Sequence, residues 1–128
     1  DGVSLRPWLQ GGTPAAWRDA VHFEFDLRGG WPAAAPPPLG LAPEACGMAA
    51  MRTDRWKYVH FAGLPPLLYD LAADPGETLN LAEDPAHAGL RLHAAEAMLR
   101  WRLRHADRTL THLCASPAGL IDRRAIRA

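Results

Sequence analysis

Residues 52–84 read RTDRWKYVHFAGLPPLLYDLAADPGETLNLAED, and they carry the clearest structural signals in the chain. Trp56, Tyr58 and His60 alternate with Lys57, Val59 and Phe61, which predicts a strand over residues 56–61. After a connection rich in Gly and Pro, residues 67–71 predict another short strand. Asp74-Pro75-Gly76-Glu77 has the composition of a tight turn, because Pro presets φ and Gly tolerates positive φ. The stretch therefore predicts two neighbouring strands followed by an acidic turn.

The end of this stretch predicts the start of a helix. Asp84 is a favourable N-cap, and Pro85 suits the first helical position. Only Gly89 disfavours helix from there to residue 106, so we expect one long helix over residues 85–106. Apolar residues recur along it at three- and four-residue steps, which should let the helix lie across a sheet. This stripe consists of Leu92, Ala95, Met98, Leu99 and Leu103.

Two further strands are predicted upstream. Residues 20–27 alternate in polarity, which is typical of a half-buried strand. Its apolar side is Val21, Phe23, Phe25 and Leu27, and its polar side is His22, Glu24 and Asp26. Residues 46–51 form an apolar run that suits a strand buried on both faces. The predicted fold class is therefore α+β, a small antiparallel sheet of about four strands with one long C-terminal helix packed across it.

Between these two strands, residues 29–43 contain five prolines. Proline fixes φ and removes a backbone donor, so neither a helix nor a central strand can form there. We expect a Pro-rich surface loop.

Composition narrows the possible partners. The chain has 128 residues, which suits one domain, and its formal net charge is zero. No global field therefore favours nucleic acid, and no apolar run approaches the ~20 residues that span a bilayer. Residues 1–84 hold eleven acidic and six basic side chains, whereas residues 85–128 hold three and eight. The two halves can attract each other within one chain or between chains.

Several groups of side chains are candidates for chemistry, and each has a structural alternative. His22, Glu24 and Asp26 could hold a divalent metal ion, or form a solvated strand face. The carboxylate pairs Asp70/Asp74 and Glu83/Asp84 could act in acid–base catalysis, but capping and the helix dipole explain them better. A basic helix face could bind nucleic acid or remain solvated. That face consists of Arg100, Arg102, Arg104 and Arg108, with Trp101 beside it.

The two cysteines, Cys46 and Cys114, do not make a disulfide framework at this length. A single bridge and two reduced thiols both remain open.

Several pieces of sequence, in this order, resemble sulfatases and phosphonate monoester hydrolases of the alkaline phosphatase superfamily. The similarity covers residues 1–113 and is most like the phosphonate monoester hydrolase branch. The pieces are Asp1-Gly2-Val3-Ser4-Leu5, the strand at 17–26, Arg52-Thr53-Asp54-Arg55-Trp56-Lys57-Tyr58, Leu68-Tyr69-Asp70-Leu71, Asp74-Pro75-Gly76-Glu77, Asn80-Leu81 and the helix end at 101–111.

The resemblance implies that this chain is a C-terminal subdomain that packs on a large catalytic domain upstream in the same polypeptide. Such enzymes hydrolyse phosphate, phosphonate or sulfate esters with a divalent metal ion and a formylglycine nucleophile, and they form homo-oligomers. The nucleophile arises in a Cys-x-Pro-x-Arg motif, which neither Cys46 nor Cys114 matches. We therefore assign no catalytic, cofactor-binding or metal-binding residue to this chain.

The expected role of the chain is structural, at the edge of the active-site cleft and in assembly, and we expect the chain alone to be inactive. The alternative is a stand-alone binding module with the same fold. Residues 114–128 are expected to form a basic tail that is flexible or bound to a partner. We expect a cytoplasmic protein with no nucleic-acid or membrane partner, from a sequence whose own N-terminus lies upstream of Asp1.

Overall fold

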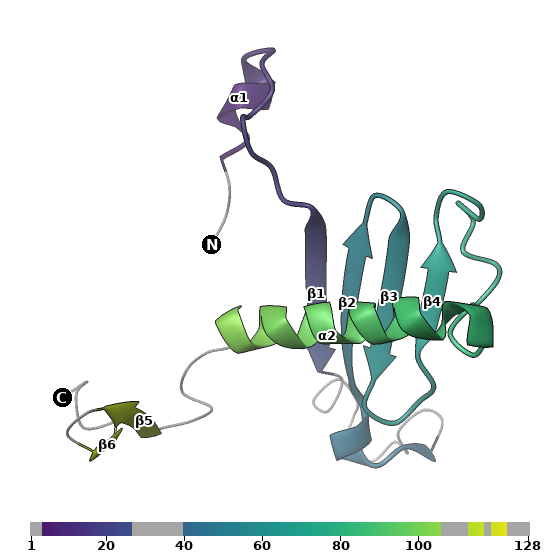
Figure 1. Cartoon of the computed structure of the whole chain (residues 1–128), viewed down its shortest axis with the longest axis vertical. Helices are drawn as coiled ribbons and strands as arrows, with labels where there is room; N and C mark the ends of the chain where they lie inside the picture. The colour runs from purple at the N-terminus through teal and green to yellow at the C-terminus, as the bar shows by residue number, and fades with distance from the viewer. Residues whose placement is uncertain (1–3, 27–39, 106–112, 117–118, 123–128) are drawn as a thin grey trace.

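The computed structural model describes residues 4–26, 40–105, 113–116 and 119–122. Four strands form an antiparallel sheet in chain order, and a long helix crosses it (Figure 1). They are β1 (Ala20–Asp26), β2 (Gly47–Thr53), β3 (Trp56–Phe61), β4 (Leu67–Asp70) and α2 (Ala88–His105). The predicted α+β class is confirmed.

The strand register divides the side chains between two faces of the sheet. On one face Met51 pairs with Tyr58, and Tyr58 pairs with Leu68. On the other face Phe23 pairs with Ala50, which continues through Val59 to Leu67. Directly opposed residues share a face in an antiparallel sheet, so each row belongs to one side only.

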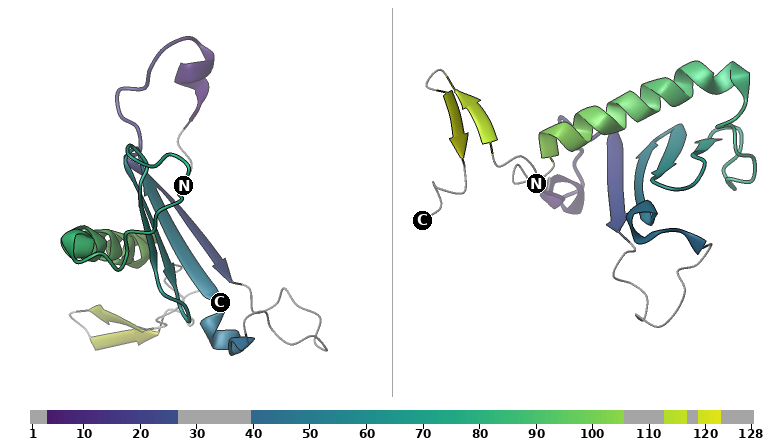
Figure 2. Two further views of the ribbon diagram at one scale, coloured as in Figure 1. Left: turned by 90° about the vertical axis from the view of Figure 1, so that its right-hand side faces the viewer. Right: turned by 90° about the horizontal axis from the view of Figure 1, so that it is seen from below.

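The core lies between α2 and the first of these faces. Leu68 is fully buried there, and the left panel of Figure 2 shows α2 on this one side of the sheet. The buried cluster is Met51, Tyr58, Leu68, Ala82, Ala94 and Met98. The Tyr58 hydroxyl reaches His60 Nδ1 at 2.9 Å, so the one polar atom of this cluster's side chains has a partner.

Capping positions α2 on the sheet. Asp84 Oδ1 accepts a hydrogen bond from the Ala86 amide at 2.9 Å, as expected of an N-cap. The chain first makes the 3-10 turn η3 (Pro85–His87) and then continues into α2. Arg91 donates to the Ala82 carbonyl at 2.7 Å, which ties the first turns of the helix to the loop before it.

The apolar stripe predicted for this helix is not the side that faces the sheet. Leu92, Leu99 and Leu103 are 62%, 57% and 76% exposed, whereas Ala94 and Met98 are buried. The large side chains of the sheet already fill the contact layer, so α2 approaches through small residues and one flexible methionine. Of the predicted stripe, only Met98 is buried and Ala95 is partly buried.

The remaining elements lie outside the main sheet. The short helix α1 (Arg6–Leu9) precedes β1, and the 3-10 turn η2 (Pro43–Ala45) precedes β2. Strands β5 (Leu113–Ser116) and β6 (Gly119–Asp122) pair in a hairpin within the region expected to be a basic tail. Most of the Pro-rich loop predicted at residues 29–43 lies outside the described residues.

We expect Leu68→Ala to lower the free energy of unfolding by about 3 kcal/mol, because it empties a fully buried site between sheet and helix. Leu79→Ala, at a position 62% exposed, should cost less than about 1 kcal/mol. Urea denaturation of both variants measures the difference. Equal losses would show that the cluster around Leu68 is not the core.

Candidate functional site

Cys46 is a buried cysteine whose surroundings fit a structural role. Cys46 is 8% exposed, is not in a disulfide, and its sulfur contacts the Ala42 carbonyl at 3.4 Å. Burial fits a structural role, because reactive cysteines are partly exposed. Cys114 lies on β5, where side chains are outside the described residues.

The polar side of β1 lies under the C-terminal end of α2. The His22 ring stacks on Trp101 with centroids 4.3 Å apart, and Trp101 in turn stacks on His105 at 5.0 Å. Burial lowers the pKa of His22, and the nearby His105 lowers it further, against Asp19 and Glu24, which raise it. A solvated face is therefore the wrong interpretation for His22, which packs against the helix.

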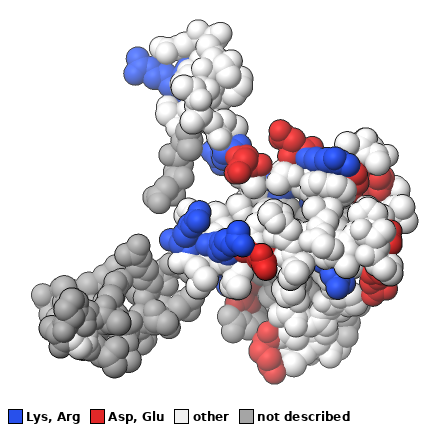
Figure 3. All heavy atoms as spheres, in the orientation of Figure 1, with Lys and Arg blue, Asp and Glu red and all other residues white. Residues whose placement is uncertain are grey.

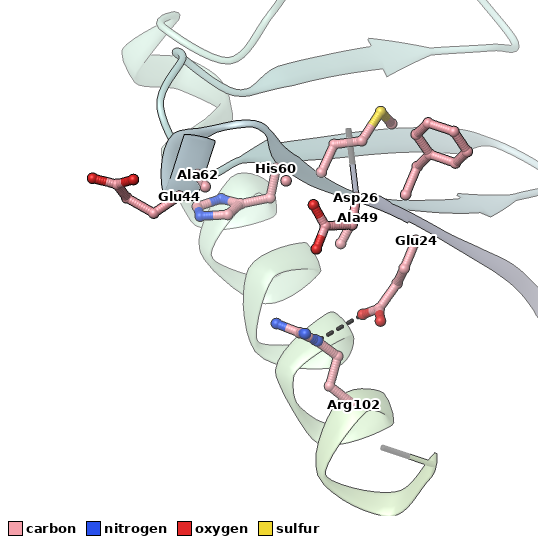
Figure 4. Close-up of a pocket in the computed structure, with 10 residues that line it drawn as sticks. Glu24, Asp26, Glu44, Ala49, His60, Ala62 and Arg102 are labelled. Carbon is pink, nitrogen blue, oxygen red and sulfur yellow. Dashed lines mark ion pairs between the residues drawn. The ribbon is translucent and has the colours of Figure 1, made fainter. Parts of the chain in front are cut away.

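A hollow of about 610 Å³ opens beside this contact, where the ends of β1, β2 and β3 meet α2 (Figure 4). Arg102 Nε pairs with Glu24 Oε1 at 2.6 Å across its rim. Asp26, Glu44 and His60 also line the hollow. No three His, Cys, Asp or Glu side chains in the described part of the chain are arranged to hold a metal ion. The His22, Glu24 and Asp26 trio therefore does not come together as a metal centre.

The paired carboxylates serve the backbone of their own turns. Asp74 accepts hydrogen bonds from the Thr78 and Leu79 amides at 2.7 and 2.8 Å, and the Leu79 bond is the largest cause of its lowered pKa. Partial desolvation raises the pKa of Asp70, but Arg55 and the Ala72 and Ala73 amides outweigh it and lower the pKa overall. Each group is held as an acceptor, which suits a turn and not a general acid.

Glu77 fastens the acidic turn to the sheet. Its φ of 56° lies in the left-handed region, which costs a non-glycine residue about 1 kcal/mol. Its carboxylate pairs with Arg52 at 3.1 Å and also with Lys57. These two bases are opposed on neighbouring strands, so one carboxylate bridges β2 and β3. The Lys57 hydrogen bond is the largest cause of the lowered pKa of Glu77.

Asn80 closes the free edge of β4. Its Oδ1 accepts from the Leu68 and Ala82 amides at 2.9 and 3.0 Å, and its Nδ2 donates to the Pro66 carbonyl at 3.3 Å. The Leu81 amide donates to the Leu68 carbonyl at 2.8 Å. These bonds satisfy backbone groups that an edge strand leaves open.

The basic face predicted on α2 is divided between ion pairs. Arg100 bonds Glu96 at 3.0 Å on its own helix, and Arg102 bonds Glu24 of β1. Figure 3 shows Lys and Arg gathered over the C-terminal half of α2, while Asp and Glu are spread over this face of the molecule. Arg108 lies outside the described residues. Arg100 and Arg102 are thus both paired with carboxylates, so nucleic-acid binding gains no support here.

The opposite face of the sheet is an exposed apolar surface, which the sequence interpretation missed. Val21, Phe23 and Phe25 are 48%, 56% and 49% exposed, and the two Phe rings lie 6.0 Å apart. A shallow groove of about 520 Å³ runs from β1 to β4 over this face. It is lined by Val21, Phe23, Met48, Ala50, Val59, Phe61 and Leu67, with His22, Arg52 and Lys57. We call this surface the open face. The alternation of β1 signalled it, but not which side α2 would cover.

The N-terminal helix region exposes apolar groups as well. Leu5, Trp8 and Trp17 are 57%, 47% and 40% exposed, and Trp8 contacts Trp17 edge to face at 6.0 Å. None of the helices in the described part of the chain combines the length and apolar character that crossing a bilayer requires.

Comparison with known proteins identifies the class of this chain. Models of protein families give no match. The chain is 48% identical to the multifunctional alkaline phosphatase superfamily protein PehA of Trinickia caryophylli over 123 residues, which are 96% of this chain and 24% of that protein. The choline-sulfatase of Rhizobium meliloti is 39% identical over 85 residues, 66% of this chain and 13% of that protein.

A solved structure gives the same answer. The phosphonate monoester hydrolase of Agrobacterium radiobacter superposes with a TM-score of 0.70 at 48% identity, covering 96% of this chain and 24% of that one. The chain thus spans about a quarter of the length of PehA and of this hydrolase, and the matched part is their C-terminal part. The fold and sequence therefore define a C-terminal subdomain of the alkaline phosphatase superfamily. Within it, the chain is similar to phosphonate monoester hydrolases and to a choline-sulfatase.

We expect acidification to destabilise the fold through His22. A histidine whose folded pKa is depressed contributes its full stability above the unfolded value near 6.5 and loses it as the pH falls below that value. The free energy of unfolding should thus fall as the pH drops below about 6.5. His22→Phe, which keeps a ring against Trp101, should show a smaller fall. Equal pH dependence of the two proteins would contradict this role.

We expect Asn80→Ala to cost about 2 kcal/mol, because it leaves the part-buried Leu68 amide without its side-chain acceptor. Asn80→Asp keeps both acceptor bonds but places a carboxylate oxygen, which cannot donate, against the Pro66 carbonyl, so part of the loss remains and we expect about half the cost. Thermal and urea unfolding measure both. An Asp variant as unstable as the Ala variant would show that the acceptor bonds are not what matters.

Proposed function

We propose that this chain is the supporting C-terminal subdomain of a metal-dependent hydrolase of phosphonate, phosphate or sulfate esters. The observation that carries the proposal is the open face, whose three β1 side chains Val21, Phe23 and Phe25 are about half exposed. Monomeric soluble proteins seldom expose a continuous apolar surface of this kind. The upstream region of the same polypeptide, which accounts for about three quarters of the length of PehA, is the occupant we propose.

The candidate residues support a structural role. Asp70, Asp74, Glu77 and Asn80 belong to the sequence signature, and all of them bond backbone or bridge strands. We therefore expect the divalent metal ion and the formylglycine nucleophile of the complete enzyme to belong to residues upstream of Asp1. Residues 1–113 form the subdomain in this proposal, and residues 114–128 form an arm for assembly. A cytoplasmic location and a homo-oligomeric state are parts of the same proposal.

The isolated chain should not hydrolyse esters. We expect no metal-dependent turnover of aryl phosphate, phosphonate or sulfate esters above the rate in buffer with Mn²⁺. The polypeptide encoded by the complete gene should hydrolyse at least one of the three classes. Turnover by the 128-residue chain would overturn the assignment, and an inactive complete polypeptide would favour the stand-alone binding module.

Charges on the open face should lower activity and stability in the complete polypeptide, where the upstream region is present. In the complete polypeptide, Phe23→Asp with Phe25→Asp places two charges on the open face, and we expect lower activity and a lower unfolding temperature. Leu79→Asp, at an exposed apolar position outside the residues lining the groove, is the matched control and should change neither. Equal behaviour of the two variants would mean that the upstream region does not dock on this face.

A further inference from the structure

A second apolar surface lies on the far side of α2 from the sheet. Leu92, Leu99 and Leu103 are 62%, 57% and 76% exposed, so each points away from the core. They follow one another at steps of seven and four residues, which aligns them along one line of the helix. We call these three residues the leucine seam. Single exposed leucines are ordinary, but three in line on one helix make a surface that a partner can cover.

The spacing of the seam is that of a helix-pairing face. Positions 92, 96, 99 and 103 follow steps of four, three and four, which is the pattern of alternating a and d positions in a heptad. Glu96 is the one polar residue among the four. The opposite side of α2 is already committed to the sheet through Ala94 and Met98. The helix thus carries two separate apolar sides, one of which has no partner among the described residues.

We propose that α2 pairs antiparallel with α2 of a second copy of this chain, about a twofold axis that passes between Glu96 and Leu99. The proposal rests on the proposed function, because an upstream region docked on the open face lies on the other side of the sheet from α2 (Figure 2). Contact with the open face does not by itself cover the leucine seam. A twofold axis makes one patch its own complement, so a single exposed seam suffices for both copies.

Charge selects the antiparallel orientation. With Leu92 against Leu103 of the second copy, Glu96 lies next to Arg100 of that copy, and the symmetry repeats the contact. Within one chain these residues already pair at 3.0 Å, so the carboxylate can bridge both guanidinium groups. A parallel pair in register would instead oppose Glu96 to Glu96 and Arg100 to Arg100. Like charges placed directly opposite one another destabilise such a pairing.

The pairing of isolated chains should be weak. A standard interface has roughly 20–30 residues on each side, and the seam supplies only a few. We therefore expect a reversible, concentration-dependent dimer of the 128-residue chain. In the complete polypeptide, contacts between other residues about the same twofold axis can strengthen the dimer.

Analytical ultracentrifugation of the full chain measures the dissociation constant of the dimer and so tests whether the leucine seam forms its interface. Leu99→Glu should weaken dimerisation at least roughly tenfold, because it removes a buried leucine and adds a charge at the centre of the seam. His93→Glu introduces the same side chain at an exposed position beside the seam and should change the dissociation constant less than about threefold. Circular dichroism and unfolding temperature verify that both variants keep the fold. Equal dissociation constants for wild type and Leu99→Glu would overturn the proposal.

Cross-linking tests the orientation. In a background with Cys46→Ala and Cys114→Ser, a mixture of Leu92→Cys and Leu103→Cys chains should cross-link with a short bismaleimide. Each variant alone should not, because identical positions are eleven residues out of register, about 16 Å along the axis. Cross-linking of Leu92→Cys alone, or none in the mixture, would overturn the antiparallel pair.

The two proposals fail in distinguishable ways. If Leu99→Glu sediments like the wild type, the proposed pairing through the leucine seam is wrong, but the ester hydrolysis expected of the complete polypeptide is not affected. If the complete polypeptide is inactive, the hydrolase assignment is wrong. The cross-link between Leu92→Cys and Leu103→Cys still tests the antiparallel pairing of α2.

Discussion

The close packing of α2 on one face of the sheet is the contact on which the other features depend. Small residues on the helix, Ala94 above all, let it approach Tyr58 and Leu68. Because α2 covers this face of the sheet, His22 packs against Trp101, whereas Phe23 and Phe25 lie on the uncovered face. The same packing also turns the largest aliphatic side chains of the helix away from the sheet. The packing of α2 on this one face therefore leaves both the open face and the leucine seam exposed.

The family signature now has a physical explanation that involves no catalysis. Asp74 folds the acidic turn around its carboxylate, and Glu77 joins that turn to two strands. Asn80 then seals the edge of β4, and Asp84 begins the helix. Each of these polar residues satisfies backbone donors or neighbouring bases that would otherwise be left without partners. Their order along the chain follows the path of the backbone from β4 to α2.

The local elements could be predicted from the sequence, because their signals are local. Alternation located β1 and β3, Asp84-Pro85 located the start of the helical segment, and Asp74-Pro75-Gly76-Glu77 located the turn. The assignment of faces could not be predicted in the same way. Alternation shows that the two sides of β1 differ, but it does not say which side meets a neighbour within the same chain. The conventional expectation that the Phe side is internal holds only when the whole core belongs to one segment.

The error in the helix has the same origin and is informative for that reason. A helix that packs on one side only has one apolar stripe, and the sequence of α2 was interpreted in that way. The structure instead divides its apolar residues between a small side facing the sheet and a leucine side facing outward. Both failures concern apolar groups that the described residues leave exposed. The helices and strands are where the sequence predicts them, but several of the apolar side chains expected in the core are exposed. The simplest physical account is that these side chains contact residues outside this chain. The open face and the leucine seam lie on opposite sides of the sheet and helix, so a contact confined to one side leaves the other exposed.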